Sequence, residues 1–417
     1  MHSRRKFIKQ AALGTVAGAG LLGNASAKGD LFSDADDLDR ILNEKVLRIS
    51  ELKDPVILES VELLRHGNNF LCRVRSTDGA EGISVSNNMQ MVHLYPIFVH
   101  RIQPFFVGKD ARKLEELLDE VYVFQSNYKL QSLALWVPLA TLEFAVLDLL
   151  GKLTGKSLGQ LIGDIHHEYI AVYQANNYRG RSAEESIDLI ERDVKEYGAK
   201  ALKFKVGGRM SNNADYPPGR SEKLIPLVRK RFGPDMVIYA DSNGSYTPDE
   251  GIRIGRLMEQ YNYDFYEEPV PFDWYEETLE VAKALNIPVA GGEQEPSLRN
   301  FRWLIHNNAL DIVQPDIFYF GGMVRSMKVA RMAEARGKEC TPHISGSGLG
   351  YLYMMHFVAA LPNAGPYHEF KGFNREIPLD SPTSSLSSED GRVKVPTGPG
   401  LGVEIEPSFI AKHSLVK

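Results

Sequence analysis

Near its middle the chain reads Ala201-Leu202-Lys203-Phe204-Lys205-Val206-Gly207, residues 201–207. In a β-strand, residues i and i+2 point to the same face, so a strand here directs both lysines to one side and Phe204 to the other. Two like charges so close repel, and partial burial disfavours the charged form further. A lysine in that setting is suited to work as a base near neutral pH. The alternative is a solvated edge strand with outward-facing lysines, because charged residues are mostly exposed.

On both sides of this stretch, strand and helix patterns alternate, and the helix at 182–197 opens with the capping box Ser182-x-x-Glu185. Another helix begins with Thr247-Pro248, an N-cap followed by a proline at the first helical position. Strands are predicted at 169–173, 203–206, 236–241, 265–267, 289–293, 311–314, 339–343 and 367–370, and helices at 182–197, 222–232, 247–261, 275–285, 298–306, 324–336 and 349–360. Eight strands with seven helices predict an α/β fold, a (β/α)7β-type modified TIM barrel over 166–372; a doubly wound open sheet is the alternative.

The region before the barrel has a different pattern. Residues 56–64, 70–75 and 81–85 are predicted strands of an antiparallel meander, and 110–122 and 138–153 are predicted helices. Strands followed by helices indicate an α+β domain, which we assign to 50–165 as a cap on the barrel. The loop-rich segment 373–417 is expected to return to the cap.

The first 27 residues are expected to lie outside the fold. A basic stretch with Arg4-Arg5 precedes an apolar run from Ala11 to Leu22, and Ala25-Ser26-Ala27 matches a cleavage site. This pattern resembles a twin-arginine signal peptide, and the apolar run is too short to span a bilayer as a permanent helix. We therefore expect export, an extracytoplasmic or periplasmic mature protein starting near Lys28, and no stable membrane anchor.

Composition excludes several classes of protein. The net charge of −6 gives no reason to expect a nucleic-acid partner. The two cysteines, Cys72 and Cys340, match no zinc or iron–sulfur spacing and are too few for a disulfide framework. With 43% hydrophobic and 24% charged residues, the chain is of the ordinary soluble type.

Acidic residues close the third, fourth and fifth barrel strands. Asp241, Glu267 and Glu293 follow each other at intervals of 26 residues, so one βα unit separates each pair. All three are expected at the C-terminal mouth of the barrel, where barrel enzymes place their active sites. Converging carboxylates repel unless a cation is present, and an all-oxygen set suits Mg²⁺. One such acid alone could simply cap the next helix, but three at equal spacing favour a metal site.

Strands six and seven contribute an acid and a histidine. Asp316 follows Val313-Gln314-Pro315, and His343 follows Thr341-Pro342. Adjacent strands could place Asp316 against one ring nitrogen of His343, which would orient the imidazole and raise its pKa. The alternative for His343 is a structural histidine. Glu369, at strand eight, is a further candidate whose alternative is a salt-bridged residue at the rim.

Taken in order, these motifs resemble the enolase superfamily: Lys-x-Lys, Asp-Ser-Asn-Gly, Glu-Glu-Pro, Gly-Gly-Glu, Pro-Asp and the strand-seven histidine. Two lysines combined with a His–Asp pair resemble the mandelate racemase subgroup of its mandelate racemase/muconate lactonizing enzyme family. The segments 147–152 and 390–396 also resemble that family's cap and C-terminal segments. The likeness therefore covers nearly all of the chain after the leader.

The resemblance implies a role for each residue. Asp241, Glu267 and Glu293 would bind Mg²⁺, while Lys205 and His343 would be acid/base residues on opposite faces of a carboxylate substrate. Lys203 would tune Lys205 and neutralise the substrate carboxylate, Asp316 would orient His343, and Glu369 would join the catalytic set. The implied chemistry is removal of a proton α to a carboxylate, with Mg²⁺ and the lysines offsetting the charge that develops. We also expect a homo-oligomer.

The implied chemistry leaves the reaction open between dehydration and racemisation, epimerisation or cycloisomerisation. Polar residues follow strands one and three, and such a lining favours a polyhydroxylated substrate, so we expect dehydration of a sugar acid to a 2-keto-3-deoxy acid. These residues are Gln174, Asn176, Asn177, Tyr178, Arg179, Asn243 and Ser245.

Three other functions compete with this interpretation. A metal-dependent hydrolase would favour a His-x-His pair on strand one, which is absent. A nicotinamide enzyme would have to use the glycine-rich segment 346–350, which lies late in the chain and could instead face an anion at a helix N-terminus. A non-catalytic sugar-acid binding protein would have no need of both bases.

The leader generates the first prediction. Replacing Arg4 and Arg5 together by lysine should trap the full-length precursor in the cytoplasm, because the twin-arginine route reads that pair. Fractionation of a twin-arginine-competent host, followed by immunoblotting, measures the ratio of precursor to mature protein. Unchanged export of the double variant would show that the leader is misassigned.

Overall fold

The computed structural model describes residues 30–346, 348–371 and 377–417, and side chains from residue 37 onward. The predicted leader, residues 1–27, lies outside the described residues. Eight parallel strands form the central sheet, in the order β10-β9-β8-β7-β6-β5-β4-β11. Their bounds are β4 Tyr169–Ala175, β5 Ala201–Lys205, β6 Val237–Asp241, β7 Phe265–Glu267, β8 Val289–Gly291, β9 Ile312–Val313, β10 Glu339–Cys340 and β11 His368–Phe370.

The last strand of this sheet lies beside the first, which confirms a barrel and excludes the open doubly wound sheet. β11 pairs in parallel with β4, His368 opposite Val172, while β4 also pairs with β5. On the other side of β11, the segment leading into it makes a parallel bridge from Ala364 to Cys340 of β10. The sheet therefore curves round until its two ends meet, so all strand ends face one mouth.

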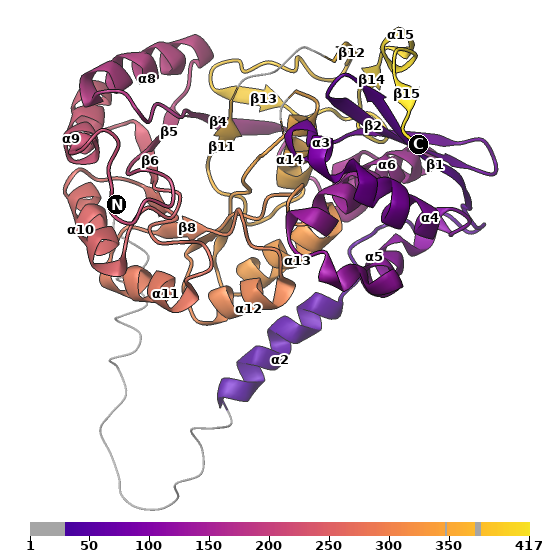
Figure 1. The fold of residues 1–417 in the computed structure, drawn as a ribbon, viewed down its shortest axis with the longest axis horizontal. Helices are drawn as coiled ribbons and strands as arrows, with labels where there is room; N and C mark the ends of the chain where they lie inside the picture. The colour runs from indigo at the N-terminus through magenta and orange to yellow at the C-terminus, as the bar shows by residue number, and fades with distance from the viewer. Residues whose placement is uncertain (1–29, 347, 372–376) are drawn as a thin grey trace, which may run out of the picture.

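Seven helices alternate with these strands and lie on the outside of the sheet: α8 Ala183–Tyr197, α9 Arg220–Phe232, α10 Pro248–Gln260, α11 Tyr275–Ala284, α12 Leu298–His306, α13 Met323–Glu334 and α14 Gly350–Ala359 (Figure 1). The Ser182–Glu185 capping box opens α8 as predicted, and Gly198 closes it in the left-handed conformation. The Thr247 side chain makes no capping hydrogen bond within α10; it bonds instead to Asn213 of a neighbouring loop.

The N-terminal strands are β1 Leu58–His66, β2 Asn69–Ser76 and β3 Glu81–Val85, antiparallel as predicted. Before the barrel the structure has the helix α2 Asp30–Asn43, which packs on α12 and α13, and the helices of the capping unit: α3 Asn88–Ile97, η1 Phe98–Ile102, α4 Gln103–Phe106, η2 Ala111–Lys113, α5 Leu114–Val123, η3 Phe124–Lys129, α6 Leu133–Thr154 and α7 Leu158–Ile162. This capping unit lies on the side of the molecule opposite α8 to α11 (Figure 1).

Helix α2 is absent from the sequence-based prediction, which began the fold near residue 50. Its composition is polar overall, but Leu38 and Ile41 lie one turn apart on one face and are buried, a helical signal that the sequence-based prediction missed. Its position depends on distant partners: Arg299 and Arg302 of α12 both bind the Asp39 carboxylate, at 2.6 and 2.9 Å.

The long helix α6 is the core of the capping unit. It is apolar enough to cross a membrane by length and composition, but 89% of that apolar window is buried inside the protein, as in a core helix. Strand β3 packs directly on it at Gly82, where a Cβ atom would lie 2.0 Å from the Ala145 carbonyl oxygen. On its other side, the buried Glu143 carboxylate accepts hydrogen bonds from the backbone N–H groups of Met323 and Val324, which begin the barrel helix α13. Helix α6 thus joins the cap to the barrel.

The C-terminal segment contacts both units. Its strand β13 (Arg392–Lys394) pairs with β4 of the barrel, and β15 (Ser414–Leu415) pairs with β1 of the cap. Between them, β12 (Leu379–Asp380) pairs with β14 (Glu404–Ile405), and the short helix α15 (Pro407–Ile410) follows. The expected return of the chain to the cap is therefore present, with an additional strand on the barrel.

Candidate active site

Three carboxylates converge at the mouth of the barrel. Asp241 and Glu267 are the last residues of β6 and β7, and Glu293 lies two residues beyond the end of β8. All three are buried, and each contributes an oxygen that lies within 4.8 Å of the others. The equal spacing in the sequence therefore corresponds to one cluster in space, which we call the carboxylate triad.

The electrostatics of the carboxylate triad fit a divalent cation. Burial and the neighbouring charge of Asp241 raise the pKa of Glu267 to about 7. One carboxylate oxygen of Glu293, Oε2, is buried and accepts no hydrogen bond. A hard cation such as Mg²⁺ would relieve this repulsion and would coordinate oxygen ligands only.

Both lysines of β5 point toward the triad. The Lys203 ammonium group donates hydrogen bonds to both oxygens of Glu267, at 2.8 and 2.7 Å, and lies 4.0 Å from Asp241. Lys205 donates to Asp241. Burial opposes ionisation of Asp241, but the two ammonium groups outweigh it, Lys205 more than Lys203, and hold the pKa of Asp241 below its usual range.

The expectation of a weakened lysine charge is wrong for Lys203. Burial alone would lower its pKa, but Glu267 and Glu369 outweigh burial and hold the pKa well above the usual value. The second lysine and the low dielectric both disfavour the charged form, but the folded chain also surrounds Lys203 with carboxylates, which favour it more strongly. Lys203 is therefore a permanent cation at the floor of the site.

His343 and Asp316 form a hydrogen-bonded pair, as the strand order predicted. His343 Nδ1 lies 2.7 Å from Asp316 Oδ2, and His343 Nε2 lies 3.2 Å from Glu293. Burial lowers the pKa of His343, but Glu293, Glu369 and then Asp316 raise it to about 8. Because Asp316 holds Nδ1, the second ring nitrogen faces the triad.

Glu369 connects the two ends of the site. Its carboxylate lies 3.9 Å from the Lys203 ammonium group and 3.6 Å from His343 Nε2, and Lys371 lies 3.1 Å away. Burial opposes its ionisation, but Lys203, Lys371 and His343 hold the pKa of Glu369 well below its usual value. With a side chain only 1% exposed, Glu369 is not a residue of the solvated rim.

Two further residues hold the triad in place, and sequence reasoning gave them no such role. Gln314 Nε2 donates to Glu267 Oε2 at 2.8 Å. Asn243 binds Asp241 through both its backbone N–H, at 2.8 Å, and its side-chain amide, at 3.2 Å. Both positions stood next to predicted site residues, in the Gln-Pro-Asp and Asp-Ser-Asn stretches, which was the available signal.

Much of the polar lining expected to face the substrate bonds to the protein itself. The Ser245 hydroxyl lies against the Gly208 and Ser242 carbonyl groups and has its hydrogen occupied between them, and Tyr178 donates to Asp193. Arg179 donates to backbone carbonyl groups and to Asn243. Gln174 bonds to Ala175, to Asp193 and to the Asn176 amide. The Oδ1 atom of Asn176 is buried without a partner, and Asn177 is exposed. Fewer of these polar groups are therefore free to bind the hydroxyl groups of a substrate.

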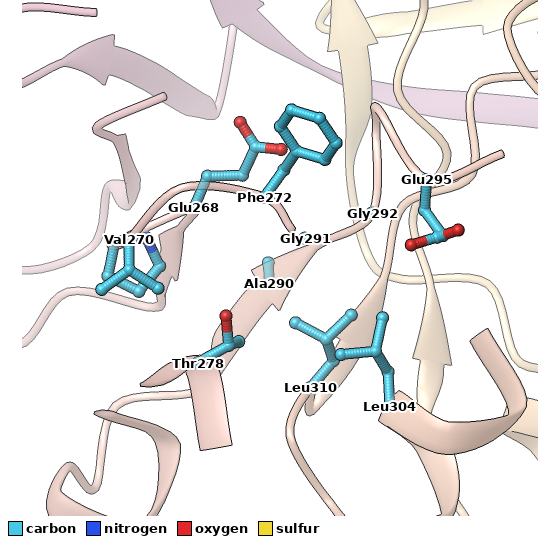
Figure 2. Close-up of a pocket in the computed structure, with 11 residues that line it drawn as sticks. Glu268, Val270, Phe272, Thr278, Ala290, Gly291, Gly292, Glu295, Leu304 and Leu310 are labelled. Carbon is cyan, nitrogen blue, oxygen red and sulfur yellow. The ribbon is translucent and has the colours of Figure 1, made fainter. Parts of the chain in front are cut away.

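Figure 2 shows a pocket next to the triad, between the ends of β7 and β8 and the helices α11 and α12. The carboxylate of Glu268 lies there beside the Phe272 ring (Figure 2). Glu268 Oε1 is buried without a hydrogen-bond partner, and burial, followed by Glu293, holds the pKa of Glu268 well above its usual value. The lysines of β5, the carboxylate triad and the His343–Asp316 pair do not line this pocket, so it is separate from the cluster that they form.

A lysine pair, a carboxylate triad and a His–Asp pair, all on the C-terminal side of one β/α barrel, are typical of metal-assisted enzymes that remove protons next to carboxylates. The sequence profile of the enolase C-terminal domain-like family matches residues 185–409. The chain belongs to this family, and so to the enolase superfamily. The glycine-rich segment 346–350 leads into α14 within the same barrel, and its Ser347 lies outside the described residues.

Individual relatives agree with this assignment. The chain is 26% identical over 341 residues to arabinonate dehydratase of Saccharolobus solfataricus, covering 82% of this chain and 89% of the relative. It is 28% identical over 325 residues to D-galactarolactone cycloisomerase of Agrobacterium fabrum, covering 75% and 82%. A mandelate racemase/muconate lactonizing protein from Paracoccus denitrificans PD1222, crystallised with magnesium, superimposes with a TM-score of 0.78 at 26% identity, covering 87% and 99%. The resemblance seen in the motifs is confirmed.

The contact between Lys203 and Glu267 generates the second prediction. In metal-free protein, Lys203→Met should lower the free energy of unfolding by about 3–5 kcal/mol, because it leaves Glu267 buried without its cation. The double variant Lys203→Met/Glu267→Gln should recover most of that loss, since the neutral amide needs no counter-charge. Urea unfolding in EDTA, followed by tryptophan fluorescence, measures both.

The matched control is Lys371→Met, which removes a half-exposed lysine from Glu369 and should cost less than about 1 kcal/mol. A double variant no more stable than Lys203→Met alone would contradict the assigned role of the ion pair.

Proposed function

We propose that the protein catalyses Mg²⁺-dependent removal of the proton α to a carboxylate, with dehydration of a sugar acid to a 2-keto-3-deoxy acid as the reaction. The observation that carries the proposal is the placement of two different bases around one carboxylate triad. Lys205 contacts Asp241, at the β6 side of the triad, and His343 lies against Glu293, at the β8 side. A substrate held over the triad would have one base on each side.

The residues present fit a magnesium ion. The carboxylate triad would hold it through oxygen ligands, with Asn243 and Gln314 fixing two of the three carboxylates. When bound, Mg²⁺ supplies positive charge that stabilises the negative charge developing on the substrate carboxylate. Lys203 adds a permanent, fully buried ammonium group on the same side.

Each base has a distinct part in the reaction. Lys205 accepts the α-proton from one face of the substrate. His343 is held by Asp316 through Nδ1, so its Nε2 is directed toward the triad. A protonated imidazole can donate its proton to a departing β-hydroxyl group. Return of a proton to the same carbon would instead give racemisation.

The substrate class is supported by the relatives and by the remaining free polar groups. Both curated relatives reported above act, by name, on a sugar acid or a sugar-acid lactone. The unpartnered Oδ1 of Asn176, at the end of β4, is available to a substrate hydroxyl. Cycloisomerisation is the second candidate, because one of those relatives is a cycloisomerase. With the twin-arginine leader, we propose that the reaction takes place outside the cytoplasm.

Metal binding is tested without turnover. Mg²⁺ at about 100 times its Kd stabilises the protein by about 2.7 kcal/mol, so the thermal midpoint should rise by several degrees over EDTA-treated protein. Glu293→Gln should abolish the rise. Glu295→Gln is the matched control, because Glu295 is equally buried but is occupied by Tyr275, Ser297 and Asn300. If Mg²⁺ raised the thermal midpoint of Glu293→Gln as much as that of wild type, the metal would not bind at the carboxylate triad.

The reaction is tested by incubating the mature protein and Mg²⁺ with D-arabinonate, D-gluconate, D-xylonate and galactarate. We expect a 2-keto-3-deoxy product from at least one, detected as its semicarbazone, and incorporation of deuterium at C2 in D₂O. His343→Asn should lower the dehydration rate at least about 100-fold while Lys205-dependent exchange persists. His167→Asn, a half-buried histidine bonded to the Leu361 carbonyl group, is the control.

Other outcomes separate the remaining candidates. Stereoinversion at C2 without a keto product would favour a racemase or epimerase, and lactone opening without loss of water would favour a cycloisomerase. Binding of a sugar acid with no exchange at C2 would point to a non-catalytic binding protein.

A further inference from the structure

A residue of the capping unit is hydrogen-bonded to the strand-seven loop that carries His343. Asn87 lies just after β3, is only 2% exposed, and is the N-cap of α3, where its Oδ1 accepts from the Gln90 N–H. Its side-chain amide has N–H donors to spare. One of them reaches the Ser345 hydroxyl oxygen at 2.8 Å, across the boundary between cap and barrel.

Ser345 passes this contact on to Asp316. Its hydroxyl donates to Asp316 Oδ1 at 3.0 Å, and its backbone N–H donates to Oδ2 at 2.7 Å. Oδ2 is also the atom that binds His343 Nδ1. A hydroxyl group has one hydrogen, and in Ser345 that hydrogen is donated to Asp316. The Ser345 oxygen can then only accept a hydrogen bond, and the Asn87 amide donates it. The bonds therefore run in one direction, from the cap amide through Ser345 to the carboxylate that orients His343.

The cap is fixed close to this contact. The Val85 N–H, two residues before Asn87, donates to the Tyr353 hydroxyl of the barrel helix α14 at 3.0 Å. Phe144 of α6 stacks on the Tyr353 ring, with the ring centres 4.1 Å apart. Because these contacts are buried, Asn87 has little freedom to move relative to α14. The position of the cap is thereby coupled to the position of the imidazole.

We propose that Asn87 and Ser345 are positioning residues, through which the capping unit sets the orientation of the His343–Asp316 pair. This deepens the proposed function and rests on it. The hydrogen bonds of Asn87 and Ser345 given above go to Gln90, to each other and to Asp316, and none goes to the carboxylate triad or to the lysines. Their loss should therefore affect the step that uses His343 and leave the step that uses Lys205 intact.

The decisive variant is Asn87→Asp. Aspartate is as good an N-cap as asparagine, so the Gln90 N–H keeps its acceptor and α3 keeps its start. A carboxylate cannot donate to Ser345, however, and would compete with Asp316 for the serine hydrogen. With the fastest sugar acid of the panel, we expect kcat for dehydration to fall about tenfold with KM within twofold, as for other groups that orient a reactive side chain.

Deuterium exchange distinguishes the two bases. Exchange at C2 that survives in His343→Asn is the Lys205-dependent part, and it should stay within twofold of wild type in Asn87→Asp. Ser345→Ala should reproduce the loss in kcat, and Ser345→Thr, which keeps the hydroxyl, should restore it. Ser182→Ala is the matched control, because Ser182 is likewise an N-cap, of the barrel helix α8, and its side chain bonds to Glu185 of that same helix.

A spectroscopic readout does not depend on turnover. The imidazole Nδ1–H proton of His343, assigned by its disappearance in His343→Asn, should shift in Asn87→Asp and in Ser345→Ala but not in Ser182→Ala. An unchanged resonance, or kcat within twofold of wild type, would overturn the inference. Failure of wild-type protein to turn over any sugar acid would instead overturn the proposed function, and the resonance would still decide the inference.

Discussion

The site depends on the repulsion among three buried carboxylates. Asp241, Glu267 and Glu293 place oxygens within 4.8 Å of one another, and burial together with the charge of Asp241 raises the pKa of Glu267 even with a lysine bound to it. Lys203 and Lys205 offset part of the negative charge from inside the chain. The negative charge that the lysines do not offset makes the cluster a site for a divalent cation, since hard cations bind where anionic oxygens converge.

Closure of the barrel completes the site. Because β11 lies beside β4 and is linked to β10, Glu369 comes within reach of both Lys203 and His343, which are far apart along the sheet. An open sheet would have left Glu369 at one edge and the lysines in the interior. The barrel therefore does more than carry the residues: it joins the lysine side and the histidine side into one connected set of charges.

The capping unit acts on this set from outside the barrel. Helix α6 reaches α13 through Glu143, β3 reaches α14 through Tyr353, and Asn87 reaches Ser345. The first two contacts are buried and the third is partly buried, and the third leads directly to the His343–Asp316 pair. The cap thus helps to hold the site residues in position, in addition to any role in covering a substrate.

The sequence by itself determined the order of strands and helices, the location of the acids at the strand ends, and the pairing of Asp316 with His343. These are consequences of the βα period, because each unit returns the chain to the same mouth, and of local signals such as the capping box at Ser182. Only the tertiary structure decided that Lys203 is a permanent cation, that Glu369 bridges both ends, that Ser245 and Tyr178 bond to the protein rather than line the site, and that α2 and Asn87 are held by partners on the barrel. Each of these features arises because residues distant in sequence come together in the interior of the protein. Their charge states and hydrogen bonds are determined by neighbours that no local sequence pattern reveals.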